Sequence, residues 1–333
     1  MLRFLVPLLA ASAAFAAGPL YELSGRIVPR PGASAARFGP VRMVPRSGGF
    51  VALFGATTPF ATDTLADVTG HFRFKKLPPG LYTVAIFIRG RGEARRTVEV
   101  SPSLADRRHR VRLTLELHDA DFTPAASWKL NIISAKELAI PARSVNDYRD
   151  AQKDLSRQDV ASAVKRLEDA VELAPQFSAA WNNLGTIAYQ SAKYDRAQEC
   201  FREALAQDPQ SYEALVNLGG VMVTLRKLDE AMKYNLQAVL TRPNDPLANA
   251  QLGMTYYLLR HDDLATKYLE RTRQLDPASY TYPQLLLFEI HVRQGEQPAA
   301  AAVLEDFLTH HPDWPQAAKM RETIAGLRGT PGR

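Results

Sequence analysis

The residues best suited to hold a metal or move a proton occur in two short runs, His261-Asp262-Asp263 and His310-His311. Imidazole and carboxylate groups at such spacing are potential ligands for a divalent metal. Their positions favour a simpler interpretation, because the first run falls between two helical segments and the second ends a helix before Pro312, where cations are favourable. The sequence contains no nucleophile elbow, P-loop, H-E-x-x-H run or dinucleotide-binding glycine pattern. We therefore predict no catalytic residues, no metal site and no cofactor, in a protein that is not an enzyme.

The single cysteine, Cys200, excludes an intramolecular disulfide framework. It falls within an amphipathic helical pattern, which predicts a buried, inert thiol rather than a link between molecules.

The N-terminus has the pattern of an export signal. Arg3 is followed by an apolar run from Phe4 to Phe15, and Ala14-Phe15-Ala16 provides small residues for cleavage. The alternative is a short membrane anchor, but the run is too short to span a bilayer as a helix. We predict a signal peptide over 1–17, a mature chain that begins near Ala17 or Gly18, and a periplasmic or secreted location without a transmembrane segment.

Positive charge is concentrated in the first part of the chain. Residues 20–118 carry 16 Lys and Arg against 7 Asp and Glu, whereas residues 119–333 carry 24 against 28. The run RGRGEARR at 89–96 suggests an anion-binding patch for glycan, lipid headgroups or an acidic protein, with a solvated basic surface as the alternative. Since the chain is expected to be exported, we predict no nucleic-acid partner. The candidate patch residues are Arg89, Arg91, Arg95 and Arg96.

A repeat organises the second half of the chain. Prolines recur at intervals of 34, 34, 34 and 35 residues, at Pro175, Pro209, Pro243, Pro277 and Pro312. Within each interval apolar residues follow a helical period, and small residues fall where two antiparallel helices would approach most closely. A proline after the second helix stops that helix from continuing. A single hairpin cannot bury its apolar face, so a period of this length predicts a solenoid of stacked helical hairpins.

Residues 178–211 resemble the tetratricopeptide repeat almost position for position. The matching positions are Trp181, Leu184, Gly185, Tyr194, Ala197, Phe201, Ala204 and Pro209. The repeats at 212–245 and 246–279 match well, 144–177 matches through its second helix, and 280–313 is degenerate at Pro283 and Leu287. The resemblance implies a concave face formed by the first helix of each hairpin. Candidate groove residues are Asn182, Asn183, Thr186, Tyr189, Asn217, Val223, Gln251, Met254 and Tyr257.

The first helices of the three best repeats contain no Lys or Arg before the turn. The sequence thus departs from the family members that hold a partner's C-terminal carboxylate with basic residues. Side-chain amides, with Tyr and Met beside them, instead suit the backbone of an extended peptide. The alternative is that these residues form helix surface without a ligand.

Residues 20–118 predict an antiparallel β-sandwich. Short runs rich in Val, Ile, Leu, Phe and Tyr alternate with glycine and proline turns. The predicted strands are 21–28, 49–55, 71–75, 81–88, 94–100 and 109–117.

Three motifs in this part resemble the carboxypeptidase regulatory-like domain, a transthyretin-like sandwich. They are Leu23-Ser24-Gly25-Arg26-Ile27-Val28, Asp67-Val68-Thr69-Gly70-His71-Phe72-Arg73-Phe74 and Leu77-Pro78-Pro79-Gly80-Leu81-Tyr82. The resemblance implies framework roles for Asp67, Gly70, Gly80 and Tyr82. It also implies an accessory module, and some relatives of this sandwich bind polysaccharide.

The predicted organisation is a signal peptide (1–17), a β-sandwich (20–118), a linker with a possible strand at Trp128–Ile133 (119–143), tetratricopeptide hairpins (144–313) and a capping helix (314–328) that Pro315 starts. The predicted function is a scaffold or adaptor whose groove binds a peptide or partner protein. The alternative is a glycan- or envelope-binding protein that uses the basic sandwich.

Overall fold

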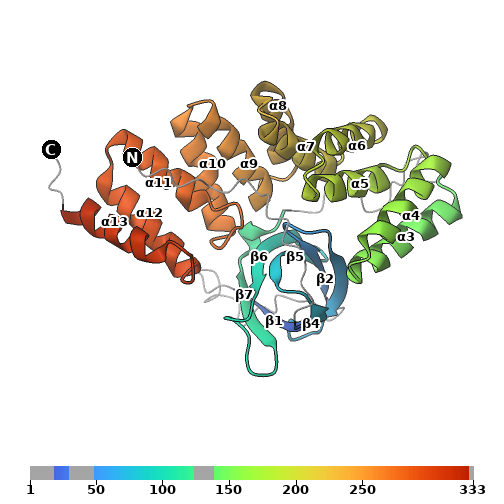
Figure 1. Cartoon of the computed structure of the whole chain (residues 1–333), viewed down its shortest axis with the longest axis horizontal. Helices are drawn as coiled ribbons and strands as arrows, with labels where there is room; N and C mark the ends of the chain where they lie inside the picture. The colour runs from blue at the N-terminus through green and yellow to red at the C-terminus, as the bar shows by residue number, and fades with distance from the viewer. Residues whose placement is uncertain (1–18, 30–48, 124–138, 330–333) are drawn as a thin grey trace. The chain divides into compact units, whose positions relative to one another are not determined.

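The computed structural model describes residues 19–29, 49–123 and 139–329. The predicted signal peptide and the possible strand at 128–133 lie outside these residues. The chain divides into two compact units, an N-terminal unit that ends at Ala214 and a C-terminal unit that starts at Leu215. The first holds the strands and two helical hairpins, and the second holds the remaining helices (Figure 1).

Seven strands form the sandwich, in two sheets ordered β4-β1-β7 and β3-β2-β5-β6. Side chains that point between the sheets, such as Leu23, Leu53, Ile86 and Val100, are fully buried, as strand alternation requires. The strands are β1 (Tyr21–Pro29), β2 (Gly49–Gly55), β3 (Ala61–Ala66), β4 (His71–Leu77), β5 (Gly80–Ile88), β6 (Gly92–Val100) and β7 (Arg110–Leu117), followed by the short 3-10 turn η1 (Asp119–Asp121).

The sandwich is confirmed, with two differences from the sequence prediction. β1 and β7 pair in parallel, whereas the other pairs are antiparallel. The chain crosses from one sheet to the other between β6 and β7, so no tight hairpin constrains the direction of β7. The strand β3 was not predicted, because its sequence ATDTLA contains few of the bulky residues that signal a strand.

The predicted framework roles in the β3–β4 turn are confirmed. Asp67 Oδ1 accepts hydrogen bonds from the backbone N of Thr69 and His71, at 2.8 and 3.0 Å. Gly70 has φ +83°, and a Cβ there would lie 2.4 Å from Ile27 O, so only glycine fits. In the next turn, the buried Tyr82 hydroxyl donates to Pro78 O at 2.7 Å.

Antiparallel helices follow, and their order confirms the solenoid (Figure 1). The helix α7 crosses the boundary between the two units. The helices are α3 (Ala142–Ser156), α4 (Val160–Leu173), α5 (Ser178–Gln190), α6 (Tyr194–Gln207), α7 (Tyr212–Thr224), α8 (Leu228–Thr241), α9 (Pro246–Leu258), α10 (Asp262–Leu275), α11 (Pro283–Gln294), α12 (Gln297–His310) and α13 (Ala317–Gly329). The last begins two residues after Pro315, which therefore precedes the helix.

The glycine column marks the closest approach within a hairpin. A Cβ at Gly185 would lie 2.6 Å from the Phe201 ring, and one at Gly253 would lie 2.9 Å from Leu269 Cγ. In the hairpin between them, Gly219 faces Asn235, a fully buried amide whose Nδ2 donates to Thr255 Oγ1 at 3.1 Å. The small residues are thus required by packing, as the sequence predicted.

The turn within each hairpin repeats as well. A left-handed residue (φ 58 to 77°) recurs every 34, 34, 34 and 35 residues, and all five are exposed. The five positions are Gln158, Ala192, Arg226, Arg260 and Gly295. The extra residue of the 35-residue interval from Pro277 to Pro312 therefore lies before Gly295, which is the one glycine among the five turn residues.

The C-terminal unit ends in an aromatic cluster. The Phe307 ring lies 4.6 Å from His311 and 5.2 Å from Trp314, and Tyr282 lies 5.3 Å from His311. Burial lowers the pKa of His311 to about 4, and the neighbouring His310 adds to this effect, while Asp306 opposes it. His311 is therefore neutral near pH 7, and the interpretation of this residue as a cation at a helix end was wrong.

Acidification is expected to destabilise the C-terminal unit through His311. Its pKa in the folded chain lies below the usual 6.5, so the stability it contributes is complete above about pH 6.5 and is lost as pH falls towards 4. The free energy of unfolding should fall by up to about 3 kcal/mol over this range. Urea unfolding of the parent chain and of His311→Phe would measure it. Equal pH dependence in both proteins would contradict the prediction.

Candidate functional site

The candidate residues on α5 are engaged within the N-terminal unit. Asn183 hydrogen-bonds the phenol of Tyr148 on α3. Thr186 Oγ1 donates to Asn182 O at 3.0 Å, and the Tyr189 ring lies 5.6 Å from that of Tyr194. These four groove candidates therefore contact other residues of α5 or of the neighbouring helices α3 and α6.

The same unit also joins this helix face to the sandwich. Gln190 Nε2 donates to Gly55 O, at the end of β2, at 3.1 Å. The Arg95 guanidinium of β6 lies 3.8 Å from a Glu213 carboxylate oxygen and 5.6 Å from the centre of the Tyr212 ring. The sequence contained no signal for these contacts between helix and sandwich, because each joins residues over a hundred positions apart.

The predicted rim of four arginines does not form. Arg91 is paired with Asp119, and Arg95 with Glu93 at 2.6 Å. Arg96 is only 6% exposed and binds Asp121 at 2.6 Å. The prediction was wrong because strand alternation turns Arg96 inwards. Nearby carboxylates pair with Arg91 and Arg95, and only Arg89 of the four is exposed.

In the C-terminal unit, the candidates on α7 and α9 form a mostly uncharged face. A Cβ at Gly220 would lie 2.6 Å from Gln251 Nε2, so the absent side chain makes room for this amide. Gln251 Oε1 is buried and accepts no hydrogen bond from any described residue. Val223 is 4% exposed and belongs to the packed interior. Asn217 and Met254 lie on the same two helices.

One end of this face carries a charged network that the sequence did not reveal. The Tyr257 hydroxyl donates to Glu289 of α11, and the Arg293 guanidinium lies 5.3 Å from the Tyr257 ring centre. Arg293 also donates twice to Asp262, with Nε at 2.8 Å. Burial raises the pKa of Tyr257, and Glu289 adds to the effect. Asp262 is thus part of an ion pair, and the described residues contain no cluster of His, Cys, Asp and Glu suited to a metal.

Cys200 is buried, as predicted, and burial raises the pKa of its thiol.

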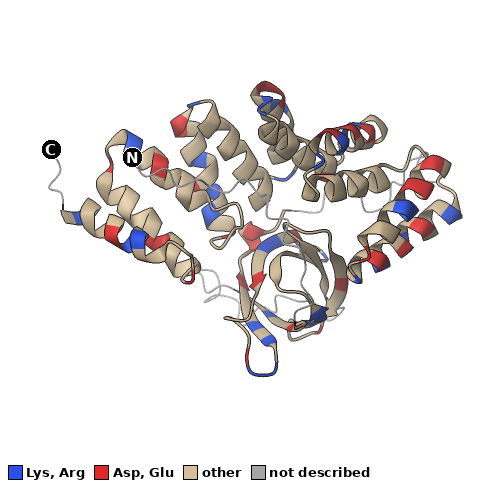
Figure 2. Ribbon diagram, in the orientation of Figure 1, with Lys and Arg blue, Asp and Glu red and all other residues tan. Residues whose placement is uncertain are grey.

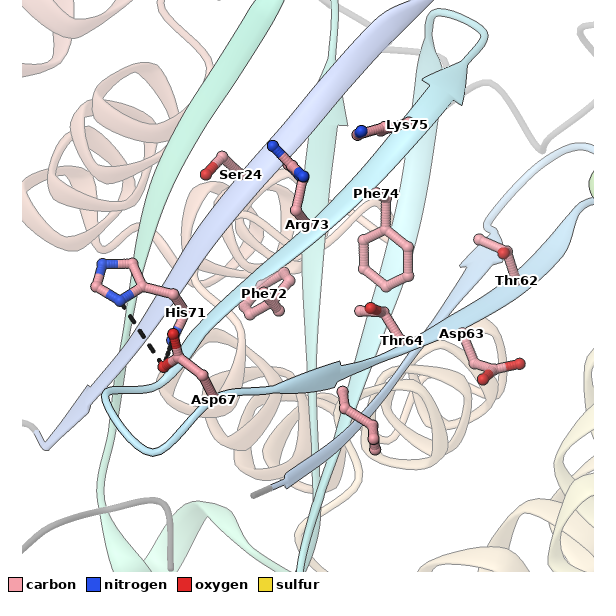
Figure 3. A pocket seen from close by; sticks show the side chains of 11 residues that line it. Ser24, Thr62, Asp63, Thr64, Asp67, His71, Phe72, Arg73, Phe74 and Lys75 are labelled. Atoms are coloured by element: carbon pink, nitrogen blue, oxygen red, sulfur yellow. Dashed lines mark hydrogen bonds and ion pairs between the residues drawn. The ribbon is translucent and has the colours of Figure 1, made fainter. Parts of the chain in front are cut away.

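A polar cleft of about 590 Å³ lies where the two sheets part, between β3 and β4 (Figure 3). Its walls carry Asp63 and Thr64 on one side and Arg73 and Lys75 on the other. Figure 3 shows the Phe74 ring between these strands, and Asp67 held against His71 at the turn. Sequence analysis missed this cleft because β3 was not predicted.

A sequence model of the family described as the cilia and flagella-associated protein 70 middle TPR-like domain matches residues 157–276. The match covers α4 to α10. The helical part of this chain is a tetratricopeptide-repeat array. No curated protein matches the chain.

Several solved structures are similar to the tetratricopeptide array. One is YrrB, described as a TPR protein with an unusual peptide-binding site, at 21% identity over 57% of this chain and 98% of that one, with a TM-score of 0.47. PilW, described as a type IV pilus biogenesis factor, has 22% identity over 56% and 91%, with a TM-score of 0.48. MamA from Desulfovibrio magneticus RS-1 has 19% identity over 53% and 99%, with a TM-score of 0.47.

Proposed function

We propose that this chain is an interaction scaffold whose C-terminal unit binds an extended peptide segment of a partner protein along α7 and α9. The observation that carries the proposal is Gln251. Its Oε1 is buried and accepts no hydrogen bond within the described residues. A buried acceptor without a donor costs about 1–3 kcal/mol, so a peptide N–H that reaches it would recover that loss.

The surroundings of Gln251 support a peptide rather than an ionic ligand. Neither α7 nor α9 contains a Lys or Arg residue. Met254 and Tyr257 are partly buried and provide apolar contact area beside the amide. An extended backbone offers N–H and C=O groups at regular spacing, which an amide side chain can pair in either direction.

Substitution of Gln251 should weaken peptide binding. Peptides selected from a random phage-displayed library against the full chain would serve as probes. Their affinity for Gln251→Ala is expected to fall roughly tenfold, because one buried hydrogen bond is lost. Gln237→Ala, at an exposed position on α8, is the matched control. Peptides that bind the Gln251 variant and the parent equally would reject this face as the site.

We also propose that the protein acts outside the cytoplasm. The proposal rests on the sequence of residues 1–17, with its positive start, apolar run and small residues before Ala17. N-terminal sequencing of the protein recovered from a periplasmic extract tests it. A mature chain that begins near Ala17 or Gly18 supports export, and an intact N-terminus in the cytoplasmic fraction contradicts it.

A further inference from the structure

We propose that the β-sandwich binds peripherally to the surface of an anionic phospholipid membrane, through a surface that we call the basic face. This inference does not depend on the peptide site proposed above. The basic face consists of Arg26, Arg73, Lys75 and Arg112 on the outer side of the sheet β4-β1-β7, and of Arg107 and Arg108 in the adjoining β6–β7 loop.

Strand register brings the basic face together from three strands. Ser24 in the central strand β1 lies opposite Arg73 of β4 on one side and Arg112 of β7 on the other. Arg26 lies two residues further along β1, and Lys75 two residues further along β4, so both point to the same side. The small Ser24 leaves the two neighbouring guanidinium groups without an intervening bulky side chain.

The charges on this surface are largely uncompensated. Within the described part of the chain, the side chains of Arg26, Arg73, Lys75, Arg107 and Arg108 form no ion pair. Arg112 is 68% exposed and lies 3.7 Å from Asp106, whose closer partner is Arg110 at 3.0 Å. The other carboxylates of this sheet surface are Glu22 and Glu116, and Asp63 and Asp67 line the same cleft as Arg73 and Lys75. Figure 2 shows the cations of β7 and the adjoining loop.

The loop between β6 and β7 combines charge with an exposed apolar side chain. Leu104 is 49% exposed and is followed closely by Arg107 and Arg108. Asp106 fixes the loop, because it accepts hydrogen bonds from the backbone N of Arg108 and Arg110, at 2.8 and 3.1 Å. The loop lies beside the start of β1, since Glu22 N donates to His109 O. Leu20, 52% exposed, is two residues before that contact.

A membrane surface fits these features better than an acidic polysaccharide does. Lys and Arg near an anionic lipid surface are attracted without specific geometry, and neighbouring strands of one sheet let several approach it together. An exposed leucine beside such cations can enter the boundary between headgroups and acyl chains. Sugar rings are usually held against exposed aromatic side chains, and the outer positions of β1, β4 and β7 carry none. No described helix is long and apolar enough to span the bilayer.

Co-sedimentation of the full chain with lipid vesicles tests the proposal. Vesicles of phosphatidylcholine alone and of phosphatidylcholine with phosphatidylglycerol are compared at low and high salt. We expect binding only to the anionic vesicles, weakened by salt because the charges are exposed. The variant Arg73→Gln/Lys75→Gln/Arg112→Gln should bind roughly a hundredfold more weakly, since three surface cations are removed. Leu104→Ser should bind roughly tenfold more weakly.

Matched controls separate the basic face from net charge. Arg157→Gln/Lys193→Gln/Lys319→Gln removes the same charge from exposed positions in two hairpin turns and on α13, and this variant should bind as the parent chain does. Leu240→Ser, at a position 75% exposed on α8, is the control for Leu104. The proposal is overturned if both triple variants lose binding equally or if neutral vesicles are bound as well. It is also overturned if the chain binds soluble polygalacturonate and no vesicles.

Discussion

Replacement of Phe201 by alanine is expected to destabilise the tetratricopeptide array by about 3–5 kcal/mol. Phe201 is 1% exposed, and its ring fills the space between α5 and α6 that Gly185 leaves open. The substitution would leave a cavity at the closest approach of the two helices, and neither backbone can move inwards without disturbing the neighbouring hairpin. Urea unfolding followed by far-ultraviolet circular dichroism would measure the loss.

A second substitution gives this prediction a sharper test. In the parent chain, Gly185→Ala would place a Cβ 2.6 Å from the Phe201 ring and should be destabilising. In the Phe201→Ala chain the same change meets no ring, and it should become neutral or stabilising because alanine favours helix over glycine by about 1 kcal/mol. Leu240→Ala, at an exposed position, should change stability by less than about 0.5 kcal/mol. If the Gly185 and Phe201 substitutions change the free energy of unfolding additively, the proposed contact between the two residues is refuted.

Loss of the buried Arg96 guanidinium is expected to destabilise the sandwich by about 3–5 kcal/mol. Arg96 and Asp121 are each less than 10% exposed and lie 2.6 Å apart, and Asp121 also accepts from His118 N at 2.9 Å. In Arg96→Ala the carboxylate would remain buried without its counter-charge. Thermal unfolding of the full chain would measure the effect as a lowered midpoint for the N-terminal unit.

Two comparisons distinguish this buried pair from an ordinary surface pair. Arg96→Met/Asp121→Asn removes both charges but keeps an acceptor for His118 N, and it should recover most of the lost stability. Arg91→Ala should cost less than about 1 kcal/mol, because its partner Asp119 is 72% exposed. If the double variant is as unstable as Arg96→Ala, the uncompensated charge is not the cause.

The sequence was most informative where a local rule repeats. The proline and glycine columns recur because every hairpin meets the same two demands, an end to the second helix and a close approach of two backbones. Gly185 and Gly253 could therefore be assigned a packing role before their neighbours were known. The turn motif of Asp67 and Gly70 was equally readable, since the hydrogen bonds that Asp67 Oδ1 accepts come from residues within five positions.

Features that depend on distant pairing could not be predicted in this way. The arginines at 89–96 looked like one cluster in the sequence, but alternation along β6 and pairing with Asp119, Asp121 and Glu213 separate them. The basic face arises from three strands whose register, including the parallel pair β1–β7, no single segment contains. The unpaired Oε1 of Gln251 likewise depends on Gly220, one repeat earlier.

The left-handed residues at the hairpin turns have a consequence for how the stability of single hairpins can change in evolution. Four of the five are not glycine, and such residues hold a backbone conformation that costs about 1–2 kcal/mol. All five are exposed, so their side chains can be exchanged without altering the buried columns. A substitution at one of these turns therefore changes the free energy of opening of its own hairpin. Selection can raise or lower the stability of one repeat in this way without changing the residues of its binding face.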